Sequence, residues 1–107
     1  MGILEILKKI ELTLTMLKSL LKVEPYFLEK VWGGDYLAKV KNYKNIKPVG
    51  ETWEVSCLEN FSCNVEKVSL GDLLDSRKIP YIVKFIDTSM SLSIQVHPDE
   101  SYAKKYE

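Results

Sequence analysis

The sequence predicts a mainly β domain preceded by an amphipathic helix. Residues 1–22 carry apolar side chains at helical spacing, with charged residues between them. From Pro25 onward, short runs of alternating apolar and polar residues are separated by turn-forming residues, as in strands. One late run, residues 92–97, places a glutamine and a histidine two positions apart. We therefore predict two parts, a helix over residues 1–22 and a β domain over residues 23–107.

The predicted helix has a single apolar stripe, formed by Ile3, Leu7, Ile10, Leu14, Leu17 and Leu21. It carries too many charges for a membrane span and lacks the apolar core and cleavage site of a signal peptide. Three alternatives remain open: a short coiled coil, a membrane-surface anchor, or a helix packed on its own domain. Met16 offers a later start that would delete most of this helix.

The remaining elements follow from turn residues and periodicity. We predict a strand over residues 26–32 that ends at a Gly-Gly-Asp turn, and then an exposed connection over residues 36–47 containing a short helical turn. Residues 52–58 and 63–68 are predicted to pair as a hairpin, and residues 69–78 to contain a short helix. Residues 81–86 are predicted to pair with residues 90–96 and to line a core, and Asp99 to precede a last helical turn.

Composition excludes several classes of protein. The 107 residues are 46% hydrophobic, which disfavours disorder, and 15 basic residues balance 15 acidic ones, which disfavours nucleic-acid binding. Cys57 and Cys63 form no C-x-x-C pair, and without a secretory signal they indicate buried free thiols in a reducing cytoplasm. Five lysines, at positions 30, 39, 41, 44 and 47, suggest either an anion-binding patch or a solvated loop.

Four polar side chains are candidates for a site. In a strand, Ser93, Gln95 and His97 would share one face, because alternate residues point the same way. Lys84 stands in an apolar strand, where its ammonium group needs an anion unless it reaches the rim of the sheet. The four side chains could face one cavity and combine metal ligation with anion capture. A structural role for His97, the only histidine, is the alternative, since two donors do not complete a zinc site.

Four segments, in order, resemble the amino-terminal part of type I mannose-6-phosphate isomerases. They are Pro25-Tyr26-Phe27-Leu28-Glu29-Lys30-Val31-Trp32-Gly33-Gly34, Gly50-Glu51-Thr52-Trp53-Glu54-Val55-Ser56, Val83-Lys84-Phe85-Ile86-Asp87 and Leu92-Ser93-Ile94-Gln95-Val96-His97-Pro98-Asp99-Glu100. The segment around Gln95 and His97 is the most specific of them. Trp32, Glu51 and Trp53 match family positions, but we assign them no chemistry, since packing explains them.

The resemblance implies a cupin, or jelly-roll, fold with one zinc ion held by a glutamine, two histidines and a glutamate. It assigns two of these ligands to Gln95 and His97, and it places Lys84 and Ser93 at the phosphate end of a sugar-phosphate substrate. The implied reaction interconverts mannose 6-phosphate and fructose 6-phosphate through an enediol, with zinc as Lewis acid.

The chain departs from the family pattern near its last residue. The expected third ligand lies in a lysine-x-glutamate segment that would follow Glu107, and Glu107 itself falls too early to be that ligand. The catalytic proton-transfer residues and several barrel strands are also expected downstream, so we predict an incomplete barrel with unsatisfied edges. Three functions compete: an isomerase fragment that needs a downstream half, a noncatalytic cupin-like metal or sugar-phosphate binding module, and a protein that self-associates through its helix.

Overall fold

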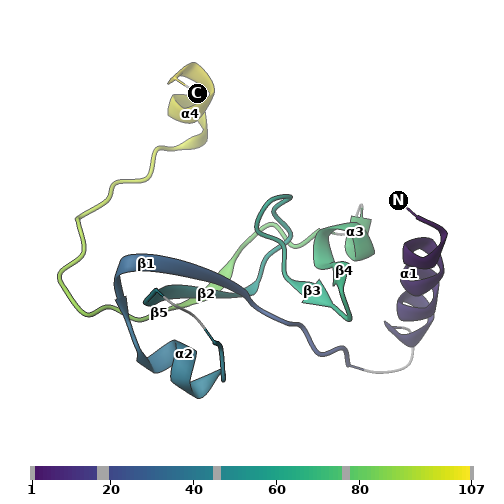
Figure 1. Cartoon of the computed structure of the whole chain (residues 1–107). Coiled ribbons are helices and arrows are strands. Elements are labelled where there is room, and N and C mark those ends of the chain that lie inside the picture. The colour runs from purple at the N-terminus through teal and green to yellow at the C-terminus, as the bar shows by residue number, and fades with distance from the viewer. Residues whose placement is uncertain (1, 17–19, 45–46, 76–77, 107) are drawn as a thin grey trace.

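The computed structural model describes residues 2–16, 20–44, 47–75 and 78–106. Figure 1 shows a small central sheet, with helices at its margins and a C-terminal segment that extends away from it. The elements in order are α1 (Ile3–Met16), β1 (Tyr26–Gly34), α2 (Tyr36–Val40), β2 (Val49–Val55), β3 (Asn64–Val65), β4 (Val68–Ser69), α3 (Leu70–Leu74), β5 (Val83–Ile86) and α4 (Glu100–Tyr106).

The central sheet is antiparallel and has the strand order β1-β2-β5. β2 therefore forms hydrogen bonds along both of its edges. Its Trp53 lies opposite Tyr26 of β1 on one side and opposite Lys84 of β5 on the other. The predicted first strand and the helical turn that follows it are confirmed, as β1 and α2. The order of the strands sets which side chains of the candidate site become neighbours.

The predicted hairpin between residues 52–58 and 63–68 is wrong. Residues 64–69 themselves form a tight hairpin, β3–β4, in which Asn64 pairs with Ser69 and Val65 with Val68. Glu66 and Lys67 form its turn, and both have positive φ angles, of 48° and 74°. Two consecutive positive φ values are typical of the type I′ turn, whose twist suits a two-residue hairpin. The apparent strand over residues 63–68 is thus two short strands.

The predicted pairing of residues 81–86 with residues 90–96 is also wrong. The strand is β5, and it pairs with β2, while residues 91–99 form no regular element. All four residues of β5 are exposed rather than lining a core, and Ile94 and Val96 are exposed at 98% and 91%. Residues 90–96 do carry the alternating apolar pattern of a strand. Among the described residues, however, they do not pair with a second strand.

The main core lies beside the sheet, between α1, α3 and the β3–β4 hairpin. Its buried members are Leu12, Cys57, Cys63, Val65, Leu70 and Leu73. Both cysteines are buried free thiols, as predicted, and burial raises the pKa of Cys63. Its thiol donates to the carbonyl oxygen of Trp53 at 2.9 Å, which ties the core to β2.

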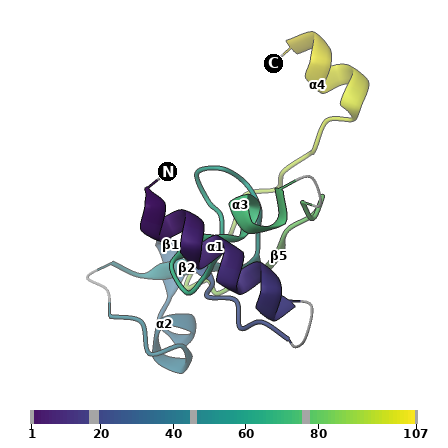
Figure 2. The ribbon, with the colours of Figure 1, turned by 90° about the vertical axis from the view of Figure 1, so that its right-hand side faces the viewer.

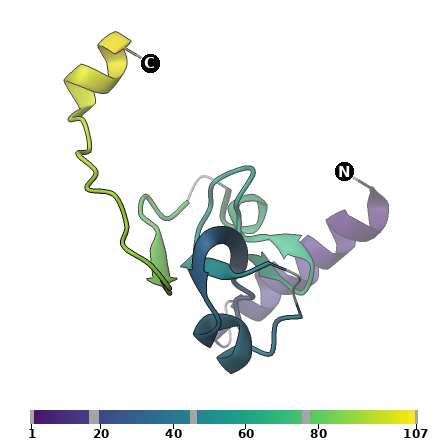
Figure 3. The same cartoon turned by 60° about the vertical axis from the view of Figure 1, so that its left-hand side comes forward.

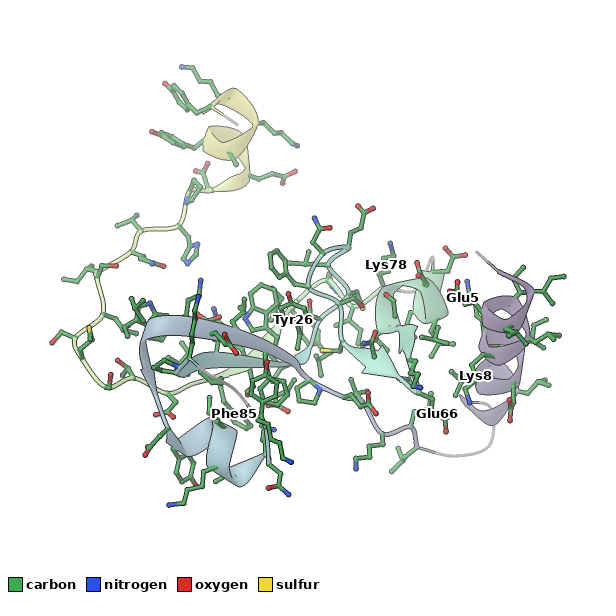
Figure 4. The ribbon with its side chains drawn as sticks, viewed as in Figure 1. Glu5, Lys8, Tyr26, Glu66, Lys78 and Phe85 are labelled. Atoms are coloured by element: carbon green, nitrogen blue, oxygen red, sulfur yellow. The ribbon has the colours of Figure 1, made fainter. Side chains whose placement is uncertain are left out.

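The helix α1 contacts this core through a residue that is not in the predicted stripe. Leu12 is 3% exposed, whereas Ile3, Leu7, Ile10 and Leu14, the stripe residues within α1, are between 53% and 75% exposed. Leu21, a stripe residue beyond α1, is partly buried against the core. Lys8, on the same side as Leu12, pairs with Glu66 of the hairpin at 2.5 Å, and the two are labelled in Figure 4. That hydrogen bond raises the pKa of Lys8. The alternative of a helix packed on its own domain is therefore supported, although the part of the apolar stripe within α1 is exposed.

The helix is also shorter than predicted. It ends at Met16, residues 17–19 lie outside the described part of the chain, and residues 20–22 are not helical. Figure 2 shows α1 lying across the molecule in front of the hairpin.

The last helix, α4, begins where the sequence predicts. The carboxylate of Asp99 accepts a hydrogen bond from the backbone N–H of Tyr102 at 2.8 Å, an N-cap contact that lowers the pKa of Asp99. Figures 1 and 3 agree that α4 stands apart from the sheet, at the end of the extended segment.

The predicted class of fold is confirmed. A mainly β, antiparallel arrangement follows an N-terminal helix, and no barrel closes among the residues that the structure describes, which is consistent with a partial cupin-like domain. In the same part of the chain, no helix is both long and apolar enough to cross a membrane.

Two leucines of α1 provide a matched test of how this helix packs on the core. We expect Leu12→Ala to lower the free energy of unfolding by about 2–4 kcal/mol, because it leaves a cavity in the core. Leu14→Ala, at a position 56% exposed, should change it by less than about 0.5 kcal/mol. Urea unfolding of both variants measures the difference. Equal losses would show that α1 does not pack through Leu12.

Candidate functional site

The candidate site is built on the pairing of β2 with β5. Glu51 and Trp53 lie two residues apart on β2 and so point to the same face of the sheet. Lys84 lies directly opposite Trp53 across the strand pair, which makes Glu51 its diagonal neighbour. Register alone therefore brings a carboxylate, an indole and an ammonium group together.

These three side chains form one polar cluster. The Oε2 atom of Glu51 accepts a hydrogen bond from Nε1 of Trp53 at 2.6 Å and another from Nζ of Lys84 at 3.2 Å. The Lys84 ammonium also lies 5.6 Å from the centre of the Trp53 ring, within cation–π range. The side chain of Glu51 is 13% exposed and that of Lys84 is 39% exposed. Lys84 therefore lies at the rim of the sheet, and the Glu51 carboxylate of the same chain is the anion that pairs with it.

A hollow of about 290 Å³ lies beside two members of this cluster, Glu51 and Lys84. Glu51 and Lys84 line it together with Ser93 and Gln95. Trp32, from the end of β1, closes part of its wall. The structure thus brings together three of the four residues singled out from the sequence.

His97 is not among the residues that line this hollow. It is exposed, in the segment between β5 and α4. The N–H of Ser89 donates to the carbonyl oxygen of Trp32 at 2.9 Å. Among the described residues, this is the last backbone hydrogen bond that ties the segment to the sheet. His97 therefore lies eight residues beyond that contact.

The donor set does not by itself fit a zinc ion. Gln95 and His97 offer an amide oxygen and an imidazole nitrogen, and a four-coordinate site needs two further ligands or one further ligand and a water. In the described ranges no group of three histidine, cysteine, aspartate or glutamate side chains lies close enough to hold a metal. Glu107 falls outside the described residues, so its exclusion as a ligand stays a prediction.

Sequence reasoning missed the role of Glu51. We explained Glu51 and Trp53 by packing, but the structure makes Glu51 the acceptor that orients both Trp53 and Lys84. The available signal was the E-x-W spacing, which places both side chains on one face of a strand. The spacing alone did not reveal this role, because Lys84 becomes a neighbour of Glu51 only when β5 pairs with β2. The sequence analysis had paired residues 81–86 with residues 90–96 instead.

Comparisons with known proteins show which proteins this chain is similar to. Among curated proteins, the chain is 36% identical to a protein named probable mannose-6-phosphate isomerase GmuF of Bacillus subtilis (strain 168), over 79% of this chain and 32% of that protein. It is 28% identical to mannose-6-phosphate isomerase ManA of the same organism, over 78% of this chain and 31% of that protein.

A third relative is the mannose-6-phosphate isomerase of Streptococcus mutans, 31% identical over 78% of this chain and 33% of that protein. No family model and no solved structure matches the chain. The chain spans about a third of the length of the curated relatives it matches. The resemblance stated from the motifs is confirmed: most of the chain is similar to about a third of each of three mannose-6-phosphate isomerases, as expected of a partial domain of that family.

The pairing of Glu51 with Lys84 can be measured by a double-mutant cycle. We expect Glu51→Gln and Lys84→Met to show a coupling of about 0.5 kcal/mol at low salt, because solvent screens a pair whose lysine is 39% exposed. The coupling should shrink as salt is added. The mutually exposed pair Glu100 and Lys104 provides the control and should couple no more strongly. A Glu51–Lys84 coupling near zero at low salt would contradict the described contact.

Proposed function

We propose that this chain is part of a zinc-dependent mannose-6-phosphate isomerase and contributes the phosphate end of its substrate site. The observation that carries the proposal is the hollow in which Lys84, Ser93 and Gln95 meet. The three relatives bear the name of this aldose–ketose isomerase, which supports the same reaction here. The proposed substrates are mannose 6-phosphate and fructose 6-phosphate, and residues 23–107 are the proposed extent of the partial domain.

Lys84 is proposed to hold the substrate phosphate. Its ammonium group has three donors, and the contact with Glu51 occupies one of them. Phosphate can therefore bind Lys84 without displacing Glu51, which would keep the lysine in place. Ser93 lines the same hollow and offers a hydroxyl donor. Because Lys84 is only partly buried, this part of the site alone should bind a phosphate weakly.

Gln95 and His97 are proposed as two of the zinc ligands. An amide oxygen and a neutral imidazole leave the metal more positive than carboxylates would, which suits a zinc ion that polarises a sugar oxygen. The remaining ligands and the proton-transfer residues are proposed to lie in the part of the relatives' length that this chain does not match. We therefore expect the chain alone to bind zinc weakly and to show no isomerase activity.

A chimera tests this proposal. We expect the purified chain to be inactive, and a chimera in which it replaces the matched part of GmuF to isomerise mannose 6-phosphate. In the chimera, His97→Asn should lower both zinc content and kcat/KM by more than about tenfold. Lys84→Met should raise KM by about tenfold with zinc retained, since it removes a charge-assisted contact.

Lys22→Gln, at an exposed position outside the hollow, is the matched control and should leave both zinc content and activity unchanged. Turnover by the unfused chain would overturn the fragment interpretation. A folded chimera that binds sugar phosphate without turnover would favour the noncatalytic binding module.

Self-association through α1 is a second proposal, favoured by the exposed apolar stripe of that helix. Ile3, Leu7, Ile10 and Leu14 are all more than half exposed, although apolar surface of this extent is normally covered. A second copy of the same helix offers a matching apolar stripe, as in a short coiled coil. The helix has only 14 residues, so the association should be weak.

Sedimentation velocity over a range of concentrations tests this proposal. We expect a concentration-dependent oligomer that Leu7→Glu combined with Ile10→Glu abolishes. Glu5→Gln, on the same helix, should have no effect. These substitutions test self-association more specifically than deletion of residues 1–15, because the deletion would also remove Leu12 from the core. A monomer at every concentration would rule the proposal out.

A cytoplasmic location is proposed as well. The free thiols of Cys57 and Cys63 support it, because such thiols persist in a reducing compartment.

A further inference from the structure

Among the described residues that line the hollow beside Glu51 and Lys84, polar and apolar side chains are equal in number. The polar ones are Glu51, Lys84, Ser91, Ser93 and Gln95. The volume of about 290 Å³ lies at the lower end of the range for small-molecule sites. A ligand that fits this hollow is therefore small and makes several polar contacts.

The lining of this hollow has no net charge. In the part of the chain that the structure describes, Glu51 is its one acidic lining residue and Lys84 is its one basic lining residue. The two are paired, with Oε2 of Glu51 and Nζ of Lys84 lying 3.2 Å apart. A ligand with several negative charges would be attracted by Lys84 but repelled by Glu51. The lining thus favours a ligand that carries one anionic group next to neutral polar groups.

One oxygen of the Glu51 carboxylate is available to such a ligand. Both hydrogen bonds that this carboxylate accepts within the described ranges, from Trp53 and Lys84, end on Oε2. A carboxylate has about four acceptor sites over its two oxygens, so Oε1 keeps its own acceptor capacity. The side chain is 13% exposed and lines the hollow, which is where a ligand can reach it.

The two bonds to Oε2 also hold the carboxylate in place before a ligand binds. The indole N–H of Trp53 donates to Oε2 at 2.6 Å, and Trp53 itself is half-buried in the same strand, β2. Lys84 donates to the same oxygen from β5. An acceptor that is already held in position loses less conformational entropy when it binds a ligand. Trp53 is therefore a positioning residue for Glu51.

We propose that Glu51 is a specificity-determining residue that accepts a hydrogen bond from a hydroxyl group of the ligand. The hollow then selects hydroxylated phosphate monoesters over esters that lack hydroxyl groups. This inference rests on the proposed function, because it takes Lys84 as the phosphate contact. A phosphate group on Lys84 brings the rest of the ligand close to Glu51, since the two side chains are in contact. The selection of a sugar phosphate would then begin at the phosphate end, without the metal.

A matched pair of phosphate esters tests this selection. Glycerol 3-phosphate and propyl phosphate have carbon chains of the same length and differ only in their hydroxyl groups. We expect the full chain to bind glycerol 3-phosphate about three- to tenfold more tightly, which is the effect of a hydrogen bond to a charged acceptor at a partly exposed site. Both esters should bind weakly, because Lys84 is 39% exposed, and NMR titration measures such weak binding.

Glu51→Gln should reduce this preference to about twofold or less. The amide has a single oxygen, which Trp53 and Lys84 both require, so its NH₂ group takes the place of Oε1. Propyl phosphate should bind no more weakly, since a negative charge beside Lys84 is lost. Glu54→Gln is the matched control and should keep the preference. Glu54 lies on the same strand and pairs with Lys41 at 2.8 Å, but it does not line the hollow.

The ratio of the two affinities separates this inference from a structural role of Glu51, because damage to the fold would weaken both esters alike. The inference is overturned if the chain binds glycerol 3-phosphate no more tightly than propyl phosphate, which includes the absence of binding by either. It is also overturned if Glu51→Gln keeps the preference.

The proposed function fails in different measurements. Lys84→Met should weaken the binding of both esters, and unchanged binding in that variant would overturn the proposed phosphate contact. A chimera without isomerase activity would overturn the proposed reaction. Neither result would alter the ratio that measures the hydroxyl contact of Glu51.

Discussion

The structure depends on β2 being hydrogen-bonded on both edges. β1 and β5 have no other partner strand among the described residues, so each is held in the sheet by β2. The core is connected to the same strand through the thiol of Cys63, which donates to the Trp53 carbonyl oxygen. Two contacts hold the chain to the sheet just past β5. They are the isolated bridge between Gly33 and Thr88 and the hydrogen bond from the N–H of Asp87 to the carbonyl oxygen of Gly50. Beyond Ser89, the chain leaves the sheet.

This arrangement explains why only part of the candidate site is preformed. Glu51, Trp53 and Lys84 lie on paired strands, and one carboxylate oxygen holds the other two groups in place. Ser93 and Gln95 reach the same hollow from a segment without regular structure. Sites on regular elements are held more accurately than sites on loops, so the proposed phosphate end should be better ordered than the proposed metal end. His97 does not line this hollow with Gln95.

The sequence predicted the positions of strands and helices better than it predicted which strands pair with each other. Strand β1, helix α2 and the Asp99 cap follow from local turn and capping residues, and the structure confirms them. The pairing of β5 was mispredicted because alternation shows that a strand exists but does not show which edge accepts it. The packing of α1 on its own domain was one of the predicted alternatives, but the residue that makes the contact was not predicted: the stripe marks one apolar face, whereas Leu12 contacts the core from another face. The grouping of Lys84, Ser93 and Gln95 was predicted, but the role of Glu51 depended on register.

Hydrogen–deuterium exchange of the backbone amides tests the central claim most directly, because it reports which segments are held in the sheet. We predict that residues 50–55 of β2 exchange slowly and that residues 91–98 exchange at nearly the rate of an unfolded chain. Protection of residues 92–96 as strong as that of β2 would contradict the account. It would show that this segment pairs as a strand and that β2 is not the element on which the site depends.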